Sequence, residues 1–364
     1  MRLSKDQFAY YLIDSIEGVS ANDKRALLSL FDEPKFFVSN FFEKAAEIKD
    51  IMGENAFINI SNIIDDKQKL KELYEEFLSF NVDILCCDEE NYPEKLFDLA
   101  EPPFLLYYRG NIRLLDGELI LFNGTRNATR YGLDMTKEFV ESFVENDLIM
   151  LSGISDGIDT ACVEKTLELG GKQIIVAAAG IDRISPAINN ELKEDVEKTG
   201  LVISEFAPKV SPQRFHYLLR NRIFAALLDV AILIEADEES KSLGVIKVAS
   251  DMGKEIFALP GNINNKFSKA PNILIANQTA TALIDPKQVV EIFRDDYYFS
   301  PKKVVVLTEE EQKIIDVIGE NSTHLDNICK QLGLTYSQIM TKLLMLESKK
   351  VVRRLAGNYY EIIK

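Results

Sequence analysis

The middle of the sequence alternates short apolar segments with amphipathic ones, and this alternation constrains the fold more than any other feature. Segments 131–145, 156–169 and 188–198 place apolar residues at helical spacing. Between and after them lie six segments rich in Val, Ile and Leu, which is typical of strands buried on both faces: 118–123, 148–152, 173–178, 201–204, 230–235 and 255–259. Short connections and this alternation predict an α/β class domain, a Rossmann-like doubly wound parallel sheet, over residues 79–296.

The segment before this sheet is predicted to be helical. Four stretches within residues 1–78 have helical periodicity, and glycine and proline are sparse among them. The turn around Gly18 resembles a helix-hairpin-helix turn, although Ser20 stands where that motif has a second glycine. We therefore expect a small helical module of SAM- or helix-hairpin-helix-like type, which serves packing rather than phosphate binding.

The last section has the element order of a winged-helix domain. After a charged, proline-containing linker at 294–303, helical patterns cover 309–318, 324–332 and 336–347, and a hairpin pattern at 351–363 turns at Gly357-Asn358. Helix, helix-turn-helix and β-wing in this order predict a winged helix over 303–364. Such domains bind DNA or mediate protein contacts, and the element order does not separate these uses.

Scarce residue types argue against catalysis. The only two histidines, His216 and His324, lie far apart in the sequence, and the four cysteines show no zinc-ligand spacing. No Walker loop, GxGxxG, GxSxG or HExxH motif is present. We therefore expect no catalytic residues, no metal and no cofactor, and a binding protein rather than an enzyme.

Charge and hydropathy bear on partners and location. With 42 Lys and Arg against 58 Asp and Glu, the formal charge is −16, which argues against a generally basic nucleic-acid binder but not against a local basic patch. No apolar run approaches a membrane span, and the first residues do not resemble a signal peptide. These features predict a cytoplasmic protein that does not contact the membrane.

Loops that follow the strands are the candidate binding site, because ligands of such sheets bind beyond the carboxyl ends of the strands. The first loop offers a glycine for close backbone approach, a hydroxyl, a guanidinium and the free N–H groups of the next helix: Gly124, Thr125 and Arg126. The second loop repeats this design with Ser152, Gly153, Gly157 and Asp159. We interpret both loops as phosphate sites; the alternative is tight turns with helix caps, Asp156 being the cap of the second.

A third element places arginines beside an aromatic residue. Arg220 and Arg222 follow Tyr217 and lead into an apolar helix. Guanidinium groups on phosphates and a ring stacked on a base would suit a nucleic acid strand, with Lys254 helping to neutralise charge. The alternative is that these arginines pair with Asp or Glu inside an acidic protein.

Taken together, the motifs resemble the DNA-processing protein A (DprA/Smf) family. The resemblance rests on six motifs in order: YPEKLFDLAEPPFLLYYRGN (92–111), GTRNATRYG (124–132), SGISDGID (152–159), LVISE (201–205), RNRIFAAL (220–227) and LPG (259–261). It implies a protein that binds single-stranded DNA during natural transformation, protects the incoming strand and loads the RecA recombinase in DNA recombination. It also implies a homodimer formed through the Rossmann-like domain.

The resemblance assigns DNA-binding roles to particular residues and also shows departures. The first two loops match the family's strand-binding loops, and Arg220, Asn221 and Arg222 match its arginine motif, with Tyr217 where phenylalanine is usual. Ser185 stands where the family has tyrosine, and Gln278 stands where it tends to have glycine. A lost glycine is expected to matter where a turn needs positive φ. The chain therefore resembles a divergent member.

Two other functions remain open from the sequence. Related Rossmann-like proteins use similar loops as nucleotide sensors or as phosphoribohydrolases, but the stretch 260–265 lacks the second glycine and the glutamate of the PGGxGTxxE motif. A transcriptional regulator is the other alternative. Its recognition helix, 336–347, would offer Ser337, Gln338, Thr341 and Lys342, followed by the basic residues Lys349, Lys350, Arg353 and Arg354.

Overall fold

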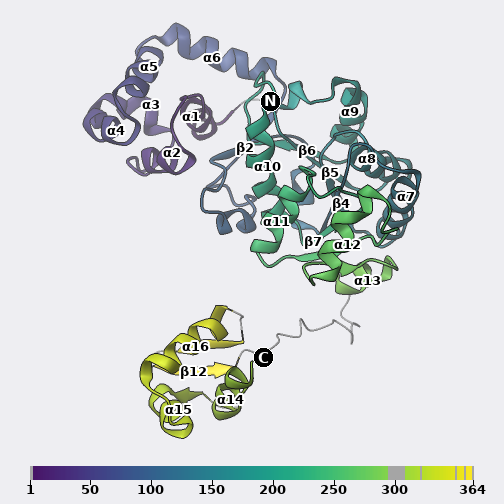
Figure 1. Ribbon diagram of the computed structural model, residues 1–364. Helices are drawn as coiled ribbons and strands as arrows, with labels where there is room; N and C mark the ends of the chain where they lie inside the picture. Colours follow the sequence, from purple (N-terminus) through teal and green to yellow (C-terminus); the bar gives the residue numbers. More distant parts are fainter. Residues whose placement is uncertain (1–2, 294–307, 320–321, 349–350, 356–357, 363–364) are drawn as a thin grey trace. The chain divides into compact units, whose positions relative to one another are not determined.

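The computed structural model describes residues 3–293, 308–319, 322–348, 351–355 and 358–362. The chain forms two compact units, Met1–Arg294 and Asp295–Lys364 (Figure 1). The predicted linker at 294–303 and Gly357 of the predicted turn lie outside the described residues, as do Lys349 and Lys350.

A nine-stranded sheet organises the first unit, in the order β1-β2-β6-β5-β4-β3-β7-β8-β9. The six predicted strands are confirmed, with ends shifted by two residues or fewer: β3 (Leu119–Asn123), β4 (Ile149–Ser152), β5 (Gln173–Ala177), β6 (Leu201–Ser204), β7 (Val230–Leu233) and β8 (Glu255–Ala258). These six strands are parallel to one another. Strand β3 lies between β4 and β7, so the strand order reverses there, as in doubly wound sheets.

The predicted parallel sheet is confirmed as the core of a larger, mixed sheet, because antiparallel pairs are added at one edge. Strand β1 (Asp83–Cys86) pairs antiparallel with β2 (Leu105–Gly110), and β2 pairs antiparallel with β6. At the opposite edge, β9 (Thr281–Ala282) pairs parallel with β8.

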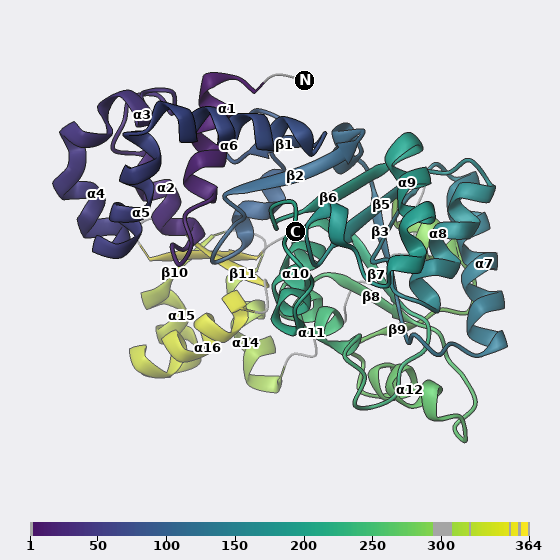
Figure 2. The same cartoon turned by 90° about the horizontal axis from the view of Figure 1, so that it is seen from above.

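Alternate residues of the central strand enter two different cores. Leu119 and Leu121 face α10 (Arg214–Leu227) and α11 (Leu243–Asp251), while Ile120 and Phe122 face α7 (Arg130–Glu145) and α8 (Ile158–Glu168). Figures 1 and 2 show α10 and α11 on one side of the sheet and α7, α8 and α9 (Asn190–Thr199) on the other. Burial on both faces explains why these strands are continuously apolar.

Residues before the sheet form six α-helices within the first unit: α1 (Lys5–Asp14), α2 (Ala21–Leu28), α3 (Phe36–Asn40), α4 (Ala45–Met52), α5 (Glu54–Ile64) and α6 (Lys67–Ser79). They share one hydrophobic core with β1 and β2, and the buried Tyr107 hydroxyl of β2 donates to the Asp14 carboxylate at 2.7 Å. The sequence-based boundary at residue 78 therefore divides a continuous core, and the division into separate domains stays a prediction.

The second unit has its own core and the predicted winged-helix order. It consists of α14 (Glu309–Ile318), β10 (Thr323–His324), α15 (Leu325–Leu332), α16 (Tyr336–Ser348), β11 (Val352–Leu355) and β12 (Tyr359–Ile362). The strands pair in the order β10-β12-β11, and Ile314, Leu325, Leu343 and Tyr360 belong to one buried cluster. Across the described parts of both units, no helix has the length and apolar character that crossing a membrane requires.

Candidate nucleic-acid interface

A shallow recess lies beyond the carboxyl ends of β4 and β5, where the first turns of α10 close its side. Its wall comes from four segments: Ile154 and Ser155 after β4, Val176–Ala179 at the end of β5, Ile184 and Ser185 further on, and Pro212, Tyr217 and Arg220 at and before α10. Two of the predicted DNA-binding residues, Tyr217 and Arg220, therefore meet the second predicted loop at one place. Like the ligand sites of doubly wound sheets, the recess lies beyond the carboxyl ends of the strands, although it lies at β4 and β5 rather than at β3, where the strand order reverses.

The loop after β4 is held in shape by Asp159. This carboxylate, in the first turn of α8, accepts hydrogen bonds from the Ser155 backbone N–H at 3.2 Å and from the Ser155 hydroxyl at 2.5 Å. Burial raises the pKa of Asp159, and the Ser155 bonds and the nearby Arg220 charge act against that rise. Asp159 therefore orders the loop, and its negative charge favours the protonated form of the nearby Arg220.

Gly153 brings backbone close to both charged groups. A Cβ at this position would lie 2.5 Å from Asp159 Oδ2 and 3.0 Å from Arg220 Nη1. Gly157 has a φ of +84°, and a Cβ there would lie 2.4 Å from the Thr125 carbonyl oxygen. Both glycines are required by close approach, and at Gly157 also by backbone conformation.

Arg220 is the unusual group of the site. Its Nε is buried and has no hydrogen-bond partner, and the guanidinium makes no ion pair with a carboxylate in the described part of the chain. It lies instead over the rings of Tyr217, at 5.2 Å, and Phe224, at 4.8 Å. Burial lowers the pKa of Arg220, and Asp159 acts against this. A buried donor without a partner is costly, so the geometry favours an anionic ligand here.

Arg126 approaches the same aromatic ring from the first loop. It is exposed, and its guanidinium carbon lies 6.0 Å from the centre of the Tyr217 ring. Two guanidinium groups thus flank one partly exposed tyrosine. This pairing of phosphate-binding and stacking groups suits a single strand.

Two N–H groups at the start of α7, those of Thr129 and Gly132, already have acceptors within the protein. The Glu235 carboxylate, which follows β7, accepts from the Thr129 backbone N–H at 2.8 Å and from the Thr129 hydroxyl at 2.6 Å. Thr129 in turn accepts from the Gly132 N–H. A carboxylate of the protein therefore occupies the place that the anion was expected to take at the start of α7.

The other small residues of both loops serve packing. The Thr125 N–H donates to the Glu235 carbonyl at 2.7 Å, and its hydroxyl accepts from the Asn127 N–H at 3.2 Å. A Cβ on Gly124 would lie 2.5 Å from Ile158. Ser152 is buried and accepts from the Gln173 amide at 3.0 Å. Asp156 was considered as the cap of α8, but Gly157 is the residue at that position.

Three predicted residues lie away from the recess. Arg222 pairs with Glu205 after β6, which is the alternative considered from the sequence, and burial raises the pKa of Glu205. Asn221 is buried, and its amide would be 2.9 Å from a Cβ on Gly244 of α11. Lys254 donates to the carbonyls of Ala226, at 3.0 Å, and Leu228, at 2.8 Å, at the end of α10. These three side chains are not used in the interface proposed below.

Several polar candidates of the winged helix already have partners. Arg353 pairs with Glu361 and Arg354 donates to Asn358 within the wing, while the Gln338 side chain accepts from Thr335 at the start of α16. The side chain of Ser337 lies outside the described residues. Among the side chains of α16 that are described, Leu344 and Met345 are exposed.

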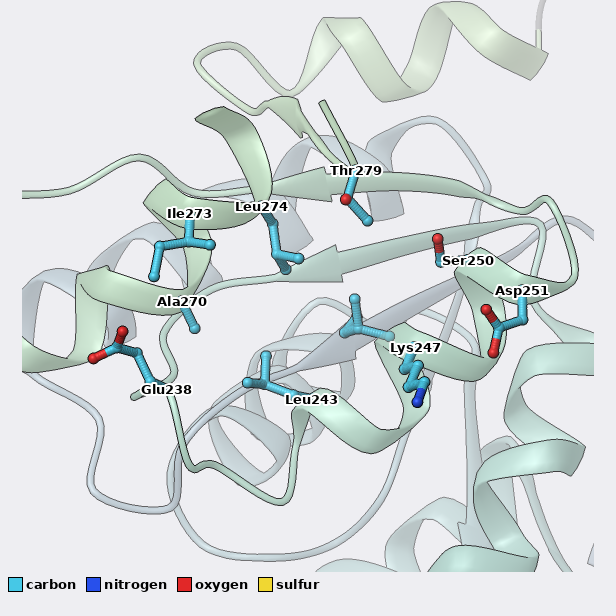
Figure 3. A pocket seen from close by; sticks show the side chains of 10 residues that line it. Glu238, Leu243, Lys247, Ser250, Asp251, Ala270, Ile273, Leu274 and Thr279 are labelled. Carbon is cyan, nitrogen blue, oxygen red and sulfur yellow. The ribbon is translucent and has the colours of Figure 1, made fainter. Parts of the chain in front are cut away.

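A second hollow of about 330 Å³ lies near the other edge of the sheet, between α11 and α12 (Lys269–Ala276) (Figure 3). Apolar side chains dominate its wall, and polar ones form its rim: Leu243, Ile246, Ala270, Ile273 and Leu274, with Glu238, Lys247, Ser250, Asp251 and Thr279. It contains no arginine and shares no residue with the recess. In the described parts of the chain, no group of three or more His, Cys, Asp or Glu could hold a metal ion.

Sequence reasoning missed residues whose roles depend on distant contacts. Glu235 acts on a loop 106 residues earlier in the chain, and no local pattern marks it. Phe206 and His216 form a stacked pair with ring centres 4.0 Å apart. His216 also lies next to the recess, since a hydrogen bond with the backbone of Ala178, a residue of the recess wall, acts to raise the pKa of His216. Ser155 lies in the second predicted loop, 152–159. Its spacing of four residues from Asp159 is the sequence signal that could have indicated their contact.

Comparison with known proteins identifies the family. The family model for DNA recombination-mediator protein A matches residues 83–294, and the model for the DprA winged helix domain matches residues 300–358. The chain belongs to this family. All four wall segments of the recess lie inside the first match.

Relatives and solved structures agree. The chain is 35% identical to DNA processing protein DprA of Streptococcus pneumoniae over 230 residues, which are 63% of this chain and 79% of that one. It is 28% identical to Protein Smf of Synechocystis over 342 residues, which are 83% of this chain and 86% of that one. The X-ray structure of the S. pneumoniae protein matches 82% of this chain and all of that chain, with a TM-score of 0.66 and 26% identity. A structure of DNA processing protein A from Helicobacter pylori, described for its single-stranded DNA binding mode, matches 60% of this chain and 98% of that chain, with a TM-score of 0.54 and 27% identity.

Proposed function

We propose that this member of the DNA-processing protein A family binds single-stranded DNA at the recess, protects the incoming strand and helps load the RecA recombinase during natural transformation. The half-buried Arg220 carries the proposal: its Nε is buried without a hydrogen-bond partner among the described residues, and a strand phosphate would supply an acceptor for the guanidinium. The structure of the H. pylori relative, which was described for its single-stranded DNA binding mode, supports the ligand class.

The proposed contacts divide between two kinds of group. Arg220 and Arg126 neutralise phosphates, and the Tyr217 ring between them stacks on a base. Gly153 keeps the loop after β4 thin enough for the sugar-phosphate backbone to reach Arg220. Neither contact reads base edges, so binding tolerates any sequence and weakens as salt rises.

This role is binding and delivery rather than turnover. The family description names a recombination mediator, which supports RecA as the partner that receives the strand. Such a handover would take place in the cytoplasm.

We also propose that the protein is a homodimer whose contact surface lies at the β9 edge. The edge of β9 is unpaired on one side, Ile273 and Ile284 beside it are 46% and 76% exposed, and the apolar hollow of Figure 3 lies next to them. A second copy offers the same edge and the same apolar groups, so a twofold contact would cover both. Ile284→Glu is expected to halve the mass measured by light scattering, and an unchanged mass would contradict this surface.

Titration of the full chain with labelled oligonucleotides tests the binding proposal. We expect tighter binding to a single strand than to a duplex of the same sequence, and Arg220→Gln should weaken single-strand binding by about tenfold or more, the effect of one charge-assisted contact. Lys254→Met, which removes a positive charge outside the recess, is the matched control and should bind like the wild type. Preference for duplex, or equal affinity in both variants, would contradict the proposal. Release of a free base from a nucleoside monophosphate would instead support the phosphoribohydrolase alternative.

A further inference from the structure

The outward face of the first turns of α10 exposes large apolar side chains beside the recess. Phe215 is 52% exposed, Leu218 68% and Leu219 38%, and spacings of three and four residues place all three on one face of the helix. The opposite face of the same turns carries Tyr217 and Arg220 into the recess. The start of α10 therefore has an apolar outward face and a recess face that carries an aromatic ring and a guanidinium, and the proposed function uses only the recess face.

Phe215 is held in place by a short ladder of rings. Its ring meets the His216 ring edge to face, with centres 4.4 Å apart, and His216 stacks on Phe206 at 4.0 Å with an interplanar angle of 24°. His216 is buried, and its Nδ1 accepts from the Gln213 backbone N–H at 3.3 Å. An exposed ring supported in this way is preorganised for a flat ligand, so little freedom is lost when one binds.

The ladder joins Phe215 to the recess. His216 interacts with the backbone of Ala178, a residue of the recess wall, so a single imidazole ring separates Phe215 from the site of the proposed function.

Unpaired arginines border the same surface. Arg214 is exposed immediately before Phe215, and Arg126 and Arg220 lie on the recess side. None of the three makes an ion pair with a carboxylate among the residues described, in a chain whose formal charge is −16. Apolar surface bordered by free cations is the arrangement expected for bases and phosphates rather than for an apolar protein partner.

We infer that Phe215, flanked by Leu218, is a second base-stacking platform that extends the single-strand path from the recess over the start of α10. The inference rests on the proposed function, since it concerns the next nucleotide of the same strand. Its ligand is an unpaired nucleobase. A duplex cannot use the platform, because its base faces are covered by stacking, and the platform therefore adds to the preference for single strands.

The absence of tryptophan from the sequence makes a direct test possible. Phe215→Trp creates the only tryptophan of the full chain, and Phe42→Trp, at an equally exposed phenylalanine of the N-terminal helices, is the matched control. Addition of an oligothymidylate is expected to quench the fluorescence of the tryptophan at 215 and to leave that at 42 unchanged. An oligonucleotide with abasic sites should bind with little quenching.

Affinity gives the second readout. Phe215→Ala should weaken binding of an oligothymidylate by about tenfold, whereas Phe215→Tyr should keep wild-type affinity, as expected for one stacked base. Binding by anisotropy without quenching at 215, together with normal affinity of Phe215→Ala, would overturn the platform but leave the proposed function standing. Loss of all binding in the wild type would instead overturn the proposed function. A change of oligomeric mass in Phe215→Ala with unchanged affinity would show that a second copy of the chain covers this face, and would also overturn the inference.

Discussion

At the level of single residues, four buried polar atoms have no hydrogen-bond partner among the residues described, and they belong to Arg25, Glu205, Arg220 and Arg222. Arg25 donates to the carbonyls of Pro102 and Pro103, and Arg222 pairs with Glu205. In each of these two arginines, another nitrogen of the guanidinium therefore has an acceptor. Arg220 has only aromatic neighbours and the nearby Asp159 charge. The difference separates Arg220, which we propose to bind a phosphate, from Arg222, the internally paired arginine of the same sequence motif.

Lys254 should affect stability and not binding. Lys254→Met removes two charge-assisted hydrogen bonds to carbonyls at the end of α10, and it is expected to lower the free energy of unfolding by about 1–2 kcal/mol. Urea denaturation measures this. Lys241→Met, at an exposed lysine, should change the free energy of unfolding by less than about 0.5 kcal/mol. Equal stability of the two variants would show that the Lys254 bonds do not hold the helix end.

His216 should make stability depend on pH. Burial lowers its pKa in the folded state below the ordinary 6.5, so between these two values the unfolded chain binds more protons and the folded state loses stability as pH falls. The free energy of unfolding is therefore expected to decrease from pH 7.5 to pH 5.5, and to decrease less in His216→Gln. Urea denaturation at both pH values measures this decrease in the wild type and in His216→Gln. An equal decrease in both proteins would contradict the claim that His216 causes the pH dependence.

At the level of elements, the strands of the parallel core could be predicted to within two residues because burial on both faces leaves a continuous apolar signal. Strand β2 was not predicted, and the direction of β1 and β2 could not be, because pairing partners are set by tertiary contacts that no local pattern encodes. The candidate site followed the same rule. The loop residues around Gly153 were found from the sequence, whereas the capping of α7 by Glu235 depends on a contact across 106 residues.

The turn after α12 offers a test of backbone strain. Gln278, which stands where the resemblance expects glycine, has a φ of +64°. A side chain in this left-handed region costs about 1–2 kcal/mol, partly offset by the larger entropy that glycine loses on folding. Gln278→Gly should therefore raise the free energy of unfolding by about 0.5–1 kcal/mol. Thermal unfolding that shows no stabilisation would mean that contacts of the glutamine compensate for the strain.

At the level of the whole molecule, the formal charge of −16 initially argued against nucleic acid as a ligand, and the structure shows how the two fit together. Arg222, Lys254 and Arg353 are bonded internally, whereas Arg126, Arg214 and Arg220, around the start of α10, have no carboxylate partner in the part of the chain that the structure describes. An acidic remainder discourages non-specific adhesion without weakening a local basic site.

The two compact units predict where binding resides. The recess and the ring ladder lie entirely within Met1–Arg294, and the second unit has a separate core. A chain that ends at residue 294 should keep single-strand affinity within about threefold of the full chain, or about 0.7 kcal/mol. Anisotropy titrations of both chains measure this. A larger loss would indicate that the winged helix contributes to strand binding.

The salt dependence of single-strand affinity tests the central claim most directly. Each phosphate neutralised on a single strand contributes about 0.7 to the slope of log affinity against log salt concentration. The double variant Arg126→Gln/Arg220→Gln should therefore have a slope shallower than the wild type by about 1.4, while Lys254→Met keeps the wild-type slope. Parallel lines for the wild type and the double variant would contradict the claim that these two guanidinium groups bind the phosphates of the strand.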